Sequence, residues 1–192
     1  MSPLLWRSDV APGQCTLGSP RVKGVGKMHA GLPVADQHDR KLVYAMSKHF
    51  PDDVLLSDNF TVAGQVIVSE ALRSYLQTSL ADHAIEYLPV TIHDHKGRVA
   101  SDKYFIVHPL GTVDCIDIDR SKVKWNPLKE KTITSCQGLV FKSDAVPPSV
   151  KLFRPSFWGQ HLMVTPAFAD ELRGTGLTGL HFTPAAGFNG IS

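Results

Sequence analysis

The chain has 192 residues, a formal net charge of +2, 43% hydrophobic residues and 20% charged residues. These values are typical of a folded globular protein, and the length suits one domain with a real core or two very small ones. Because the charge is nearly balanced and no run of Lys or Arg exceeds two residues, we do not expect direct binding of nucleic acid. No segment approaches the ~20 apolar residues that cross a bilayer, so no membrane association is expected.

Residues 1–63 are expected to consist largely of loops. PLLWRSD near the start is compatible with a strand, but the rest is rich in Gly, Pro and Asp and has weak periodicity. GVGKM (24–28) shares its Gly and Lys residues with phosphate-binding loops. It lacks their upstream Gly and the Ser or Thr that would follow Lys27, so no nucleotide site is predicted.

The N-terminal segment and the cysteines both indicate a cytoplasmic protein. MSPLLWRSDVAPG contains Arg7 and Asp9 where a signal peptide has its apolar core, so export is not expected. The three cysteines, Cys15, Cys115 and Cys136, are odd in number and form no CxxC pair. Neither a disulfide framework nor a zinc site is indicated, and a reducing compartment suits these thiols.

Two segments, 64–92 and 160–185, predict the same strand–helix–strand unit. In each segment a short apolar run ends at a hydroxyl residue, Ser69 or Thr165, which is suited to cap the helix that follows. An amphipathic stretch comes next, and then a second apolar run that contains a proline. Generic amphipathic units could share some of these features, but the common order of cap, helix and proline favours an internal repeat. Two copies are too few for a solenoid.

The remaining segments read mainly as β structure. LPVTI (88–92) and YFIVHPL (104–110) flank HDHKGR, whose Asp94 and Gly97 are turn residues, so a hairpin is predicted. Strands and helices combined in this way predict an α+β fold with a mainly antiparallel sheet. We therefore expect a single pseudo-symmetric domain over 1–192 that contains the two strand–helix–strand units.

One candidate site is a metal centre built on His93 and His95. Two His at i and i+2 share a face of a strand, and Asp102, His108, Asp114 or Asp117 could complete the three or four donors that a metal needs. With His108 and Asp114 as the further donors, this set defines a metal-dependent hydrolase as the alternative function. The predicted hairpin turn explains the same polar residues more simply, and no GxSxG motif accompanies them. Cys115 has apolar neighbours and is expected to be a buried structural thiol.

A second candidate site is a surface for a partner protein. In TVDCIDIDRSKVKW the alternation predicts a strand with Asp117 and Asp119 on one face. These carboxylates could meet a basic partner, bind a cation, or form an exposed face balanced by the basic residues downstream. Trp125, Phe157 and Trp158 lie near predicted turns. Aromatic residues there usually belong to the core, but Trp is also a favoured interface anchor.

Five segments of the sequence are similar to one known family: VIVSEALRSYL, IEYLPVTIHDHKG, YFIVHPLGTVDCIDIDRS, LFR and MVTPAFADEL with GLTGLHF. Together they resemble the eleventh immunity-protein family of bacterial polymorphic-toxin systems, formerly a domain of unknown function. The similarity runs from Gly64 to Phe182, and HPLGTVDCID and LFR are its most specific segments. Before Gly64 only LLWRSD and GLPV (31–34) fit.

The resemblance implies a binding protein without catalysis, cofactor or metal of its own. Such proteins neutralise a cognate toxin, encoded by a neighbouring gene and often a nuclease, by covering its active site or the approach of its substrate. The net charge of +2 is unlike that of an acidic nucleic-acid mimic, so occlusion by shape is favoured. A third hypothesis is a structural module that assembles through its repeat, and the mass of the purified protein with and without a candidate partner would separate it from the first.

We expect the toxin to contact two groups of residues that combine charge with aromatic side chains, as interface anchors do. The groups are Asp117, Asp119 and Trp125, and Arg154, Phe157 and Trp158.

Overall fold

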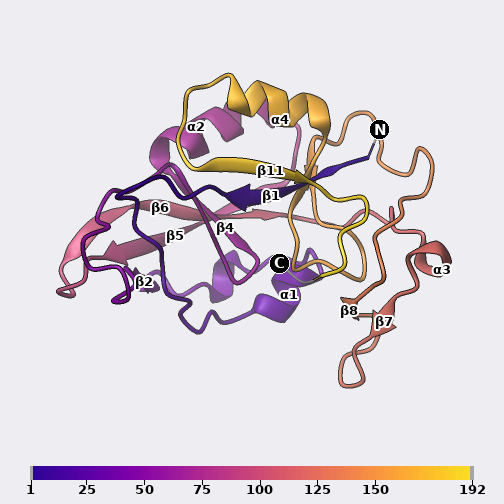
Figure 1. Cartoon of the computed structure of the whole chain (residues 1–192), viewed down its shortest axis with the longest axis horizontal. Helices are drawn as coiled ribbons and strands as arrows, with labels where there is room; N and C mark the ends of the chain where they lie inside the picture. Colours follow the sequence, from indigo (N-terminus) through magenta and orange to yellow (C-terminus); the bar gives the residue numbers. More distant parts are fainter. Residues whose placement is uncertain (1, 191–192) are drawn as a thin grey trace.

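The computed structural model describes residues 2–190 as an α+β domain (Figure 1). Its helices are α1 (Val25–His29), the 3-10 helix η1 (Ala35–Gln37), α2 (Glu70–Ser79), α3 (Ile118–Ser121) and α4 (Pro166–Arg173). The predicted class and the mainly antiparallel pairing are confirmed, but the strands form three sheets where the sequence suggested one. In this described part, no helix is long and apolar enough to cross a membrane.

The largest sheet has five strands in the order β2-β5-β6-β4-β3, and only its β2–β5 pair is parallel. The strands are β2 (Val43–Ala45), β3 (Asn59–Val62), β4 (Gln65–Ser69), β5 (Ile85–His93) and β6 (Val99–Pro109). The long β5–β6 hairpin is the predicted one. The Asp94 carboxylate accepts hydrogen bonds from the backbone N–H groups of Lys96 and Arg98, and Gly97 supplies the positive φ of 77° that the turn requires.

A second sheet has four strands in the order β11-β1-β10-β9, all antiparallel. The strands are β1 (Leu4–Ser8), β9 (Leu152–Phe153), β10 (Met163–Val164) and β11 (Leu180–Pro184), and a separate ribbon consists of β7 (Lys124–Trp125) and β8 (Ile133–Ser135). The N-terminal strand β1 therefore lies inside a sheet whose other strands come from the end of the chain.

The two main helices begin where the sequence predicts. The Ser69 hydroxyl caps α2 by accepting the N–H of Leu72 at 3.2 Å, and the Thr165 hydroxyl caps α4 by accepting the N–H of Phe168 at 3.4 Å. Each cap satisfies one of the N–H groups that the first helical turn leaves without a partner, which contributes about 1 kcal/mol. Pro166 follows the second cap, at a position where its missing N–H is not needed.

The two strand–helix–strand units have the same topology. β4 and β5 both run antiparallel to β6, which lies between them, and β10 and β11 both run antiparallel to β1, which lies between them. An outer strand, β3 or β9, pairs with the first strand of each unit. In the larger sheet the central strand, β6, follows its unit in the sequence. In the smaller sheet the central strand, β1, is the first strand of the chain. That the units also superpose as an internal repeat stays a prediction.

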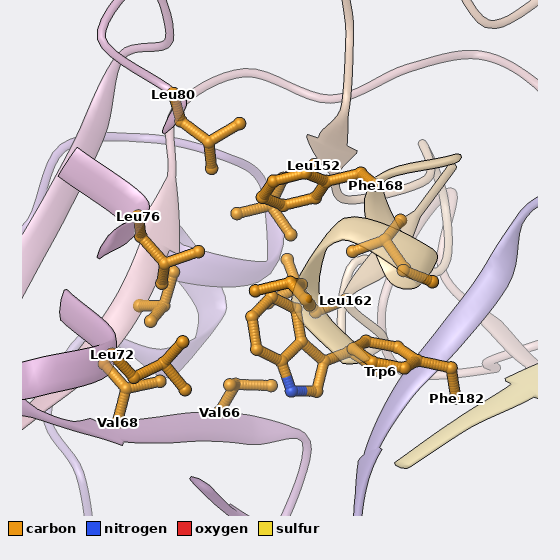
Figure 2. Packing of buried hydrophobic residues seen from close by; sticks show 14 residues of the cluster. Trp6, Val66, Val68, Leu72, Leu76, Leu80, Leu152, Leu162, Phe168 and Phe182 are labelled. Carbon is orange, nitrogen blue, oxygen red and sulfur yellow. The ribbon is translucent and has the colours of Figure 1, made fainter. Parts of the chain in front are cut away.

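Helices α2 and α4 lie side by side over the sheets and share one core (Figure 1). Figure 2 shows Leu72 and Leu76 of α2 facing Leu162 and Trp6 across this core. Each fully buried side chain of this size contributes about 1.5–3 kcal/mol relative to an exposed one. The cluster comprises Trp6, Val66, Val68, Leu72, Leu76, Leu80, Val107, Leu152, Leu162, Val164, Phe168, Ala169, Leu172 and Phe182.

The N-terminal segment between β1 and β3 covers the opposite face of the five-stranded sheet. Alternate residues of β4 face the two sides, so that Val66 and Val68 join the helical core while Ile67 packs against this segment. Residues that the segment contributes to the second core are Cys15, Met28, Val34, Leu42, Tyr44 and Met46. This region has only a few short helices and strands, and the packing of its side chains in the second core holds it in place.

The side chain of Asn59, at the start of β3, joins the two main sheets. Its amide nitrogen donates to the carbonyl oxygens of Arg7 at 2.7 Å and Gly179 at 2.8 Å, and its amide oxygen accepts the indole N–H of Trp6 at 3.0 Å. Asn59 is completely buried. One carboxamide of the larger sheet thus holds β1 and the start of β11 in the smaller sheet.

We expect Asn59→Ala to lower the free energy of unfolding by about 3 kcal/mol, because it leaves the buried indole N–H of Trp6 without a partner and also removes the bonds to the carbonyls of Arg7 and Gly179. Urea denaturation followed by circular dichroism measures this loss. Trp6→Phe, which removes a single hydrogen bond, should lower stability less. Gln77→Ala, at an exposed position of α2, is the matched control and should stay within about 0.5 kcal/mol of the wild type. An Asn59 variant as stable as this control would contradict the proposed junction.

Candidate functional site

The two groups predicted to bind a partner meet where Trp125 packs against Phe157. Their ring centroids are 5.8 Å apart and the rings are nearly perpendicular, at 83°. This edge-to-face arrangement is favoured by the charge distribution of aromatic rings. Trp125 lies in β7 and is 45% exposed, whereas Phe157 lies in the loop after β9 and is partly buried. The sequence named both residues but gave no sign that they touch.

The backbone of Phe157 holds the β7–β8 ribbon against the body of the protein. Its carbonyl oxygen accepts the N–H of Ile133 in β8 at 2.8 Å, and the neighbouring Ser156 N–H donates to the carbonyl of Val113. Phe157 has a φ of 65°, a left-handed conformation that is strained for an aromatic residue. Strain of this kind persists only where the surroundings enforce it, so this loop has a fixed shape.

Arg154 and Trp158 lie inside the protein, so neither offers a contact on its surface. Arg154 is completely buried, and its Nη1 donates to the Gly159 carbonyl at 2.7 Å. Trp158 is 1% exposed and its ring stacks on Phe188 and against His161. Within residues 2–190 the Trp158 indole N–H and two guanidinium nitrogens of Arg154 have no hydrogen-bond partner. The buried side chains of Arg154 and Trp158 therefore stabilise the 156–160 loop from the protein interior.

The predicted acidic strand around Asp117 is wrong. The Asp117 carboxylate accepts the N–H of Arg120 at 3.0 Å and caps the short helix α3. Local capping by an Asp competes with extended pairing, and here it prevails. Asp119 lies exposed in the first turn of α3. The two carboxylates do not form one face, and whether they contact a partner stays a proposal.

A cleft of about 530 Å³ lies beside the Trp125–Phe157 pair. One wall is the loop between β7 and β8, the other is α1, and the 156–160 loop forms its floor. A Cβ at Gly159 would overlap the carbonyl oxygen of His29, so only glycine lets the floor approach α1 this closely. The lining residues are Gly26, His29, Ala30, Thr112, Asp114, Lys129, Glu130, Lys131, Thr132, Ser156, Phe157, Trp158, Gly159 and Gln160.

Two partly buried histidines, His29 and His161, lie near this floor and stay neutral near pH 7. Burial, and after it the positive charges of Arg154 and Lys129, lowers the pKa of His29 to about 4. Burial, followed by the charges of Arg7, His29 and Arg154, lowers the pKa of His161 to about 3. The positive potential of this region comes from a guanidinium in the interior and from lysines at the rim.

The residues of the alternative metal site are not brought together. His93 pairs with Val99 beside the hairpin turn, whereas His108 pairs with Glu86 near the other end of the same hairpin. His108 is completely buried and bonds the carbonyl of Leu32 at 2.8 Å. Asp114 forms an ion pair with a lysine in another loop. Across the part of the chain that the structure describes, no group of three His, Cys, Asp or Glu residues is arranged to hold a metal ion.

The cysteines also have the environment of structural residues. Cys15 and Cys115 are buried, and none of the three is in a disulfide. Burial raises the pKa of the Cys115 thiol to about 12 and that of Cys15 to about 11. Since the thiolate is the reactive form, these values disfavour a nucleophilic role. The expectation for Cys115 is confirmed as to its burial.

Exposed residues at the tip of the β7–β8 ribbon were not among those that the sequence predicted to bind a partner. Leu128, at the tip of the β7–β8 ribbon, is 93% exposed, and the lysines around it are exposed as well. The signal was present in KVKWNPLKEK, where basic residues alternate with apolar ones around a turn sequence. The pattern is weak because no two of these lysines are adjacent.

A family model described as an immunity protein family matches residues 20–187, which is most of the chain. The class of protein that the match defines is an immunity protein, which implies a toxin as its binding partner. The chain belongs to the immunity protein family Imm11. The match begins well before Gly64, so the family features extend into the loop-rich N-terminal part. A comparison with curated proteins finds no match.

We expect the protein to lose stability as the pH falls from about 6.5 towards 4. In this window the unfolded chain binds protons at positions 29 and 161, whose folded-state pKa values are lowered, and the folded protein does not. Each such histidine contributes a slope of up to ~1.4 kcal/mol per pH unit. Urea unfolding at pH 7, 5.5 and 4.5 measures the slope. His161→Phe should reduce this slope, whereas Gln77→Ala, which changes no titratable group, should leave it unchanged. Equal slopes in the His161→Phe protein and the wild type would show that the pKa of His161 is not lowered in the folded state.

Proposed function

We propose that the protein binds a cognate antibacterial toxin in the cytoplasm of the producing cell and neutralises it without catalysis. The observation that carries this proposal is the family match over residues 20–187. The toxin is the product of a neighbouring gene, and a nuclease is the favoured class. Neutralisation proceeds by covering the toxin's active site or the path of its substrate.

The proposed interface is the surface around Trp125 and Phe157. An exposed Trp held by a second ring offers a large contact area that loses little conformational freedom on binding. Asp117 and Asp119 are proposed as further contacts from α3, and the buried Arg154 acts indirectly by fixing the loop. A lethal enzyme must be held with a dissociation constant of roughly nanomolar, about −12 kcal/mol, which a few such anchors supply.

Co-expression with the toxin domain of the neighbouring gene tests the proposal directly. A stable 1:1 complex and loss of toxin activity in the complex are expected. A toxin that stays fully active in the presence of excess purified protein, with no complex on size-exclusion chromatography, would overturn the proposed function. Dialysing the purified protein against EDTA, and then removing the EDTA, before it is mixed with the toxin separates this function from the metal-dependent alternative. Inhibition by binding should persist after this treatment.

Two tryptophan variants separate an interface residue from a core residue. Trp125→Ala should weaken toxin binding by about 2 kcal/mol, roughly 30-fold, because it removes an exposed aromatic anchor. Its effect on stability should be small, since Trp125 is 45% exposed. Trp158→Ala should lower the free energy of unfolding by about 3–5 kcal/mol, as expected for a buried Trp. Isothermal titration calorimetry and urea denaturation measure the two quantities. Undiminished affinity in a folded Trp125→Ala protein would place the interface elsewhere.

A further inference from the structure

The β7–β8 ribbon and its flanks carry an unusual concentration of positive charge. Between residues 120 and 131 there are five basic side chains and one acidic one, whereas the whole chain has a net charge of only +2. All five are exposed, and in the described structure none of them takes part in an ion pair. They are Arg120, Lys122, Lys124, Lys129 and Lys131.

These charges are presented on an ordered turn. The Asn126 side-chain oxygen accepts the N–H groups of Leu128 and Lys129, at 2.8 and 3.1 Å, and the Asn126 N–H donates to the carbonyl of Thr132 at 2.7 Å. In Figure 1 the ribbon projects from one end of the molecule, away from the β5–β6 turn. Leu128 at the tip and Trp125 at the base place apolar surface among the lysines.

Two of these five basic residues also line the cleft beside the ribbon. Lys129 and Lys131 lie on its outer wall, and the Lys129 ammonium comes near Gly26 on the opposite wall. Of the acidic residues that line it, Asp114 is already paired with Lys142 at 2.8 Å. The buried guanidinium of Arg154 lies behind the floor, which it supports through its bond to Gly159. Glu130 also lines the cleft, but the positive charges of Lys129, Lys131 and Arg154 outnumber it, so a carboxylate that entered the cleft would be attracted.

We propose that the β7–β8 ribbon and the adjoining cleft are a docking surface for an acidic face of a partner protein, with a carboxylate-bearing loop of the partner seated in the cleft. The inference rests on the proposed function and names the chemistry of the toxin surface that is recognised. Exposed lysines around apolar anchors steer an oppositely charged protein and raise its association rate. Leu128 and Trp125 then pack against apolar surface of the partner protein, and a phosphate backbone has no such surface. Glu130 would also repel phosphates.

The test uses the full chain, with the catalytically inactivated toxin domain of the neighbouring gene as the probe. The variant reverses three ribbon charges, Lys124→Glu, Lys129→Glu and Lys131→Glu. The matched control reverses three exposed lysines that have no ion pair in the described structure, Lys41→Glu, Lys48→Glu and Lys96→Glu. Both variants change the net charge equally, and circular dichroism checks that both are folded.

Surface plasmon resonance at 50 and 300 mM NaCl measures the association rate. We expect the ribbon variant to associate about 10- to 100-fold more slowly than the wild type at low salt and to lose most of the salt dependence. The control should stay within about twofold of the wild type. Equal rates for the two variants, with the wild type still binding, would overturn this inference but leave the proposed function intact. A wild type that binds no toxin would overturn both.

A nucleic-acid probe excludes the competing explanation of the lysines. A 20-nucleotide single-stranded DNA and a 20-base-pair RNA duplex are titrated at 150 mM NaCl and followed by fluorescence anisotropy. We expect no binding below micromolar concentrations. If either probe binds the wild type tightly, and the ribbon variant loses this binding while it keeps the toxin, the surface recognises nucleic acid and the inference fails.

Discussion

The carboxamide of Asn59 is the interaction on which the arrangement of the whole molecule depends. It bonds one strand of the larger sheet to Trp6 and Arg7 of the smaller sheet and to Gly179 just before β11, and Asn59 itself is completely buried. A shifted docking of the sheets would break these bonds, and each buried polar group left without a partner costs about 1–3 kcal/mol. With the sheets joined in this way, α2 and α4 lie together and share a core.

The smaller sheet also carries the loop of the proposed interface. β9 and β10 bracket the loop that holds Phe157, and the Arg154–Gly159 bond closes this loop on itself. The loop carbonyl at position 157 in turn fixes Ile133 of the ribbon. A surface built through buried contacts changes little on binding, which lowers the entropy lost in complex formation. The rigid support explains how a short two-stranded ribbon, which would be marginal alone, keeps its shape.

Local features of the fold could be predicted from the sequence, and non-local ones could not. The caps at Ser69 and Thr165 and the turn at Asp94 depend on residues that are close in the sequence, and the structure confirms them. The place of β1 depends on partners near the other end of the chain, which periodicity does not reveal. At Asp117 the alternation resembled a strand, but a side-chain cap won over extended pairing. For the candidate site, residue type alone suggested that Arg154 would be a surface anchor, and only packing shows that it is buried.

The overall charge of the chain conceals the feature on which the docking inference depends. A net charge of +2 argues against a nucleic-acid mimic, but it averages a strongly basic ribbon with a slightly acidic remainder. A nuclease binds phosphates through a basic groove, and a basic ribbon would be repelled there. If the toxin is a nuclease, its docking face therefore lies outside the groove that grips the phosphates, and the bulk of the bound protein blocks substrate from the side. The sign of the ribbon thus favours steric occlusion over competition for the phosphate site.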